Sequence, residues 1–71
     1  MSWSKAVYST MVSEIGYDDD TKEMLVTWAK SGKISAYKDV PEDVAVEASN
    51  APSVGQFVIS EIRDQYPHRY K

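Results

Sequence analysis

The chain has few of the residue types on which reactive sites depend. It contains no cysteine and one histidine, His68. Without cysteine there is no disulfide framework and no thiolate metal cage, and one histidine cannot form a His-rich metal site or both partners of a proton relay. No set of acid, base and nucleophile is recognisable. We therefore expect a protein that is not an enzyme, with no catalytic residues, metal, cofactor or small-molecule substrate.

Long apolar runs and excess positive charge are also absent. No segment approaches the roughly 18 to 20 apolar residues that span a bilayer, and the first residues lack the apolar core of a signal peptide. We therefore expect a cytoplasmic protein that does not bind membranes. The 8 Lys+Arg and 11 Asp+Glu residues give a formal charge of −3, which disfavours non-specific binding to nucleic acid.

What is present indicates one small globular domain. Of the 71 residues, 42% are hydrophobic and 11% aromatic, which is typical of folded chains. A chain of this length builds only one core. We expect a single domain over residues 1–71, with an ordered part at about residues 9–66 and frayed ends that include the tail from His68 onward.

Three β-rich segments predict an antiparallel meander. Residues 6–17 are rich in β-branched and aromatic side chains and predict a strand with an irregularity near Gly16. Residues 23–29 and 33–39 predict a hairpin whose loop contains Gly32 at positive φ.

Two short helices are expected after the meander. Pro41 suits a first helical turn, and this helix ends near Asn50. Ser53 and Gln56 have the spacing of a capping box, which predicts a second helix that ends before Tyr66. The expected fold is α+β, a three-stranded meander followed by two helices packed on one sheet face (βββαα). The apolar helix positions are Val44, Ala48, Ala51, Val54, Phe57, Val58 and Ile62.

The length of the hairpin loop decides which side chains share a sheet face. A three-residue loop, residues 30–32, pairs position 27 with 35 and 25 with 37. A two-residue loop would slip this register and exchange the partners. With the three-residue loop, one face carries Leu25, Thr27, Ala29, Ser35 and Tyr37. The other face carries Met24, Val26, Trp28, Ile34 and Ala36.

The order and spacing of many small motifs resemble the KTSC domain, which occurs at the C-terminus of some lysyl-tRNA synthetases and alone in bacteria and phages. The matching residues are Ile15-Gly16-Tyr17-Asp18, Leu25, Gly32, Tyr37, Val40-Pro41, Val44, Ala51-Pro52-Ser53-Val54-Gly55, Phe57 and Ile62-Arg63-Asp64-Gln65-Tyr66. The function of that family is unknown, and its place on tRNA synthetases implies RNA binding. Ala29 and Ser35 depart from the family pattern, which has aromatic residues at both positions.

The leading functional hypothesis is a non-enzymatic interaction module that binds a protein partner or itself, such as a phage or mobile-element protein that acts on a host component. If the helices cover the Tyr37 face, an apolar patch centred on Trp28 stays in water. The alternative is that the faces are inverted and the patch is core. The predicted partner-binding residues are Met24, Val26, Trp28, Ile34 and Ala36.

RNA binding is the second hypothesis. Guanidinium and ammonium groups contact phosphates, and tyrosine rings stack on unpaired bases. The competing interpretation is a solvated tail. The residues predicted for RNA binding are Lys30, Lys33, Tyr37, Arg63, Tyr66 and Arg69.

Two further motifs receive structural interpretations. The helix start at Ser53 could hold an anion, but a capping box would occupy its donors, so we interpret it as a cap. Asp18, Asp19 and Asp20 resemble a calcium loop, but Lys22 and Glu23 occupy positions where that loop needs a ligand and a glycine. We therefore predict that the three aspartates form a turn.

Overall fold

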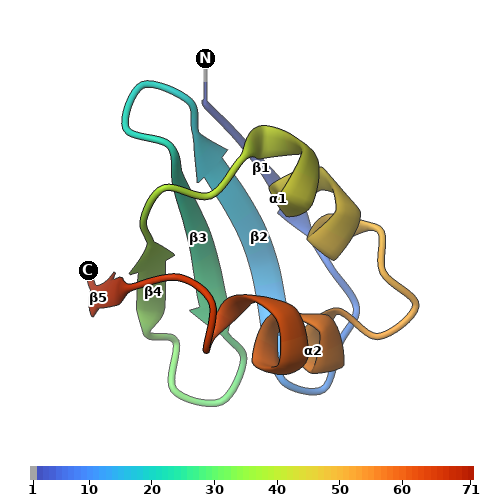
Figure 1. Cartoon of the computed structure of the whole chain (residues 1–71). Coiled ribbons are helices and arrows are strands. Elements are labelled where there is room, and N and C mark those ends of the chain that lie inside the picture. The colour runs from blue at the N-terminus through green and yellow to red at the C-terminus, as the bar shows by residue number, and fades with distance from the viewer. Residues whose placement is uncertain (1) are drawn as a thin grey trace.

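A five-stranded antiparallel sheet forms one layer of the protein, in the order β1-β2-β3-β4-β5. The computed structural model describes residues 2–71. Figure 1 shows that neighbours in the chain are also neighbours in the sheet. The strands are β1 (Ser2–Ala6), β2 (Val12–Asp18), β3 (Glu23–Trp28), β4 (Ile34–Tyr37) and β5 (His68–Tyr70).

The helical segments form the second layer, on one side of the sheet (Figure 1). Helix α1 spans Glu42–Ser49, close to its predicted bounds. Helix α2 (Val54–Phe57) continues directly into a π-helical turn, η1 (Val58–Ile62). Among residues 2–71, no helix is long and apolar enough to cross a membrane.

The sheet has two more strands than the three predicted. The segment predicted as one strand, residues 6–17, is divided by a turn at Ser9, whose side-chain oxygen accepts the backbone N–H groups of Met11 and Val12 at 3.2 and 3.4 Å. Before this turn, only Ala6 of the predicted segment belongs to β1, which begins at Ser2. The irregularity expected near Gly16 lies instead between Val12 and Glu14, where the register of β2 shifts.

Strand β1 also fixes helix α1. The indole N–H of Trp3 donates to Glu42 Oε2 at 3.0 Å, at the beginning of the helix. Two residues along, Lys5 Nζ donates to Asn50 Oδ1 at 2.6 Å, at its end. Because alternate residues of a strand share a face, one short strand holds both ends of the helix.

The fifth strand corrects the prediction of a frayed tail. His68 pairs with Tyr37, and Tyr70 pairs with Ser35. Backbone hydrogen bonds flank this pairing on both sides, from Lys38 N–H to the Pro67 carbonyl at 2.8 Å and from Lys71 N–H to the Ile34 carbonyl at 2.9 Å.

The hairpin register differs by one residue from the predicted one. Met24 pairs with Tyr37 and Val26 with Ser35. The loop has four residues, because Trp28 and Lys33 face each other and Trp28 N–H donates to the Lys33 carbonyl at 2.9 Å. Gly32 adopts the predicted positive φ, 72°.

This register overturns the predicted assignment of faces. Met24 and Val26 are fully buried with Tyr37 on the face that the helices cover. Trp28 is half-buried against the same core, and its indole N–H donates to Ser35 Oγ at 2.8 Å. The core residues are Val7, Val12, Ile15, Tyr17, Met24, Val26, Tyr37, Val40, Ala45, Ala48, Val54, Val58 and Ile62.

Tyr17 connects this core to the segment that enters helix α1. Its ring is 2% exposed, and its hydroxyl donates to the Val40 carbonyl at 2.6 Å. Burial raises the pKa of Tyr17 above the ordinary value of 10.0, and nearby carboxylates, first that of Glu42, raise it further.

We expect Tyr17→Phe to lower the free energy of unfolding by about 1–2 kcal/mol, because the buried Val40 carbonyl would lose its donor. Urea unfolding followed by circular dichroism measures this. Tyr8→Phe is the control, since the Tyr8 side chain is fully exposed, and we expect its effect to stay within about 0.5 kcal/mol. Equal effects of the two substitutions would contradict the role of the hydroxyl.

Stability should also fall in alkaline solution. The pKa of Tyr17 is higher in the folded protein than in the unfolded chain, so its contribution is complete below about pH 10 and is lost as the pH rises toward the folded-state pKa. Between about pH 9 and 11, the free energy of unfolding should fall less in Tyr17→Phe than in the wild type. The difference between the two proteins should be that of one ionisable group. Parallel pH profiles of the two proteins would refute this prediction.

Candidate functional site: a basic edge and an uncovered sheet face

The cationic side chains gather at one edge of the sheet although the protein is acidic. Residues 30–38 and 63–71 hold six of the 8 Lys+Arg residues and one of the 11 Asp+Glu residues. The pairing of β4 with β5 brings these two segments together. Neither helix lies over β4 or β5 in Figure 1, and all three residues of β5 are exposed, although Ser35 and Tyr37 of β4 are buried.

The acidic side chains concentrate elsewhere. The β2–β3 turn and the beginning of α1 meet around Tyr17, at the end of the sheet away from the β3–β4 loop (Figure 1). The carboxylates whose charge acts on the Tyr17 hydroxyl are those of Glu42, Asp19, Asp43 and Asp18. The small net charge therefore conceals two regions of opposite sign.

Aromatic rings and a cation contact one another along this edge. The rings of Tyr37 and His68 lie 5.2 Å apart, and His68 contacts Tyr70 edge-on at 5.6 Å between centroids. The ammonium group of Lys33 lies 5.6 Å from the centre of the Tyr70 ring. Tyr70 is 63% exposed, so this ring remains accessible beside the cation. We call the exposed side chains of Lys30, Lys33, Arg63, His68 and Tyr70 the basic edge.

The residues predicted for RNA binding fall into two groups. Lys30, Lys33, Arg63 and Arg69 are exposed, as that role requires. Tyr37 is 1% exposed and cannot stack on a base, because the corrected register turns it into the core. Tyr66 is half-buried against the core. Tyr70 belongs to the same basic and aromatic segment of the sequence as Arg69, but it was left out of the predicted set because residues 68–71 were interpreted as a frayed tail and not as a strand.

Only some of the residues predicted to bind a partner are accessible to solvent. Met24, Val26 and Ala36 are fully buried, and Trp28 lies on the helix side. Ala36 and Ile34 face the opposite side from Trp28, because they pair with Leu25 and Thr27. The prediction that all five residues share one solvent-exposed face is therefore wrong. A shift of one residue in the pairing moves the side chains of β4 to the opposite face relative to those of β3.

The side of the sheet away from the helices carries a different set of residues. A hollow of about 450 Å³ lies there. We call this surface the outer face. Its residues include Ser2, Ser4, Glu14, Gly16, Asp18, Leu25, Thr27, Ile34, Arg69 and Lys71.

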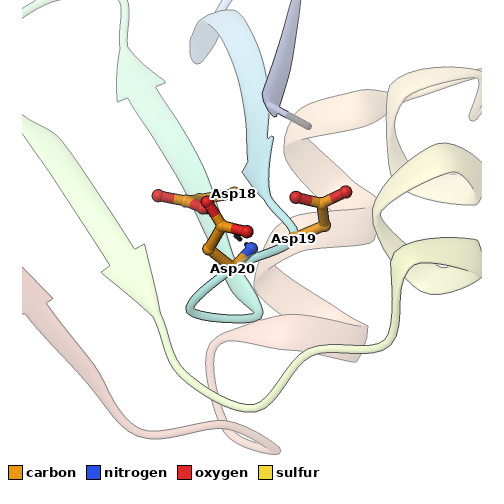
Figure 2. A group of neighbouring side chains, drawn as sticks. All are labelled: Asp18, Asp19 and Asp20. Atoms are coloured by element: carbon orange, nitrogen blue, oxygen red, sulfur yellow. Dashed lines mark hydrogen bonds between the residues drawn. The ribbon is translucent and has the colours of Figure 1, made fainter.

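The three consecutive aspartates form the predicted turn. Asp20 N–H donates to Asp18 Oδ1 at 3.0 Å (Figure 2). The carboxylates of Asp18, Asp19 and Asp20 lie within 4.8 Å of one another. Neighbouring acidic groups of this kind are common without a bound metal ion. The capping box predicted at Ser53 does not form. Ser53 precedes α2 and makes no side-chain hydrogen bond to the helix, and neither does Phe57, which precedes η1.

Comparisons with known proteins agree with this fold. The family model of the KTSC domain matches residues 8–66. A crystal structure of a KTSC domain protein from Yersinia pestis has a TM-score of 0.89 and 25% sequence identity, covering 100% of this chain and 99% of that chain. A search of curated proteins found no match.

The fold defines a small α+β domain, with a five-stranded antiparallel sheet and helices on one side. The chain belongs to the KTSC domain family, whose model matches most of its residues.

Arg69 links strand β5 to strand β3 on the outer face, and the loss of this contact should be measurable. Its guanidinium group pairs with Glu23 at 3.2 Å, and the Glu23 side chain is only 11% exposed. We expect Arg69→Ala to cost about 1–2 kcal/mol of unfolding free energy, because Glu23 would keep a largely buried charge with Thr21 Oγ1 as its remaining donor at 3.1 Å.

Arg63→Ala is the matched control, since its pair with Asp64, at 3.9 Å, is exposed on both sides. Its expected cost is below about 0.5 kcal/mol. Thermal and urea unfolding of the two variants would contradict this account if Arg63→Ala proved the more damaging change.

Proposed function

We propose that the protein is a non-catalytic module that binds single-stranded RNA at the basic edge. The observation that carries the proposal is the exposed Tyr70 ring, with the Lys33 ammonium group over it and His68 in edge contact with it. An accessible ring provides a platform on which a base stacks, and an adjacent cation contacts its phosphate.

The charge distribution supports a local site on an acidic protein. Counterion release depends on the phosphates that cations neutralise at the contact, so a patch is sufficient where the rest of the surface is acidic. The acidic region around Tyr17 would repel the RNA from the other end of the sheet. This repulsion would orient the RNA along β4 and β5.

A single strand fits this edge better than a duplex. The cations lie on short segments and loops, and no described helix or strand projects outward to enter a groove. Stacking on Tyr70 also requires an unpaired base. The same arrangement tolerates any base, so we expect weak sequence preference.

Fluorescence anisotropy with a labelled 12-nucleotide uridine-rich RNA tests the proposal. Tyr70→Ala should weaken binding about 10-fold, because one stacked base contributes about 1–3 kcal/mol. Tyr8→Ala is the matched control, since it removes another fully exposed tyrosine that lies in the β1–β2 loop. Lys33→Gln should weaken binding more than Lys22→Gln, which removes the same charge from the β2–β3 turn.

The salt dependence of RNA binding distinguishes contact with phosphates from base stacking alone. Contact with about three phosphates predicts that the logarithm of the binding constant falls with a slope of about −2 against the logarithm of salt concentration. Lys33→Gln should reduce that slope. The absence of binding at 50 mM salt and 200 µM protein, or equal losses in Tyr70→Ala and Tyr8→Ala, would overturn the proposal.

A further inference from the structure

The outer face has the apolar floor and the charge pattern of a surface that pairs with its own copy. Leu25, Thr27 and Ile34 are half-buried on β3 and β4, and Gly16 beside Leu25 has no side chain to fill the hollow. Both helices lie on the other side of the sheet (Figure 1).

Opposite charges flank this floor in one row across the strands. Glu14 pairs with Thr27, Thr27 pairs with Ile34, and the backbone of Lys71 donates to the Ile34 carbonyl at 2.9 Å. Along this row an acidic residue is followed by a threonine, an isoleucine and a basic residue. Both charged residues are exposed and line the same hollow.

We propose that a second copy of this chain packs on the outer face, related by a two-fold axis that runs along the strands midway between β3 and β4. This rotation keeps each row in place and reverses the order of the strands. It therefore sets β2 of one copy over β5 of the other, and β3 over β4. Glu14 then faces Lys71 of the second copy and Thr27 faces Ile34, so the Glu14–Lys71 ion pair forms twice by symmetry.

The same row selects this arrangement over the other face-to-face dimer. A two-fold axis across the strands would keep the strand order and set Glu14 near Asp18 of the second copy, on the same strand. Like charges placed across an interface oppose association. The axis along the strands is thus the one that brings opposite charges together.

The size of the face sets the expected strength. With this axis the four strands β2 to β5 of the two copies overlap, a width of about 19 Å at about 4.8 Å a strand, and β1 extends beyond the contact. With a floor of three half-buried side chains, we expect a dissociation constant of about 100 µM at low salt, which is a weak dimer.

Sedimentation equilibrium from 20 to 500 µM protein in about 50 mM salt tests the dimer by exchanging charges. Glu14→Lys and Lys71→Glu each place like charges opposite one another in the homodimer, so each should weaken association about 10-fold. An equimolar mixture of the two variants restores both opposite-charge pairs and should associate as well as the wild type. Glu47→Lys, on the exposed side of α1, makes the same charge change as Glu14→Lys and should leave association unchanged.

The outcomes separate the proposal from its alternatives. The proposal is supported if both single variants lose dimerisation and their mixture recovers it. A wild-type protein that stays monomeric at 500 µM contradicts it, as does a dimer insensitive to these charges or a mixture that fails to recover. Circular dichroism of each variant verifies folding. RNA binding uses Tyr70 and Lys33 on the helix side, so its failure and the failure of this dimer are independent results.

Discussion

The pairing of Val26 with Ser35 is the constraint on which the rest of the structure depends. A strand exposes alternate residues to opposite sides, so this one pairing places Met24, Val26 and Tyr37 together beneath the helices. It also leaves Leu25, Thr27 and Ile34 on the outer face. The four-residue loop between Trp28 and Lys33 sets the register, and the Trp28 indole bonded to Ser35 Oγ stabilises it from the core side.

Charge is organised around the same sheet. The β2–β3 turn and the start of α1 gather carboxylates at one end, whereas β4 and β5 gather cations at one edge. Arg69 links the two kinds of region, because its pair with Glu23 crosses from β5 to β3. A net charge of −3 therefore says little about what the surface can bind, since binding depends on the local field.

The sequence predicted features that local chemistry determines. Pro41 and the small apolar positions after it located α1, Gly32 located the positive φ of the hairpin, and Asp18 located a turn. The order of short motifs indicated the family. The faces of the sheet were assigned wrongly because β3 carries apolar residues on both sides, so alternation alone could not choose the register. The edge strand β5 has three exposed residues, and its pairing with β4 is long-range, so local pattern did not indicate it.

The most direct test of the register compares Val26→Lys with Thr27→Lys, two neighbouring positions on opposite faces. Because Val26 is fully buried, an ammonium group there should cost about 4 kcal/mol or more and unfold much of the protein. Thr27 lies on the outer face opposite Glu14, so the same change should cost less than about 1 kcal/mol. Urea unfolding in which Thr27→Lys is the disruptive variant and Val26→Lys is tolerated would contradict the account.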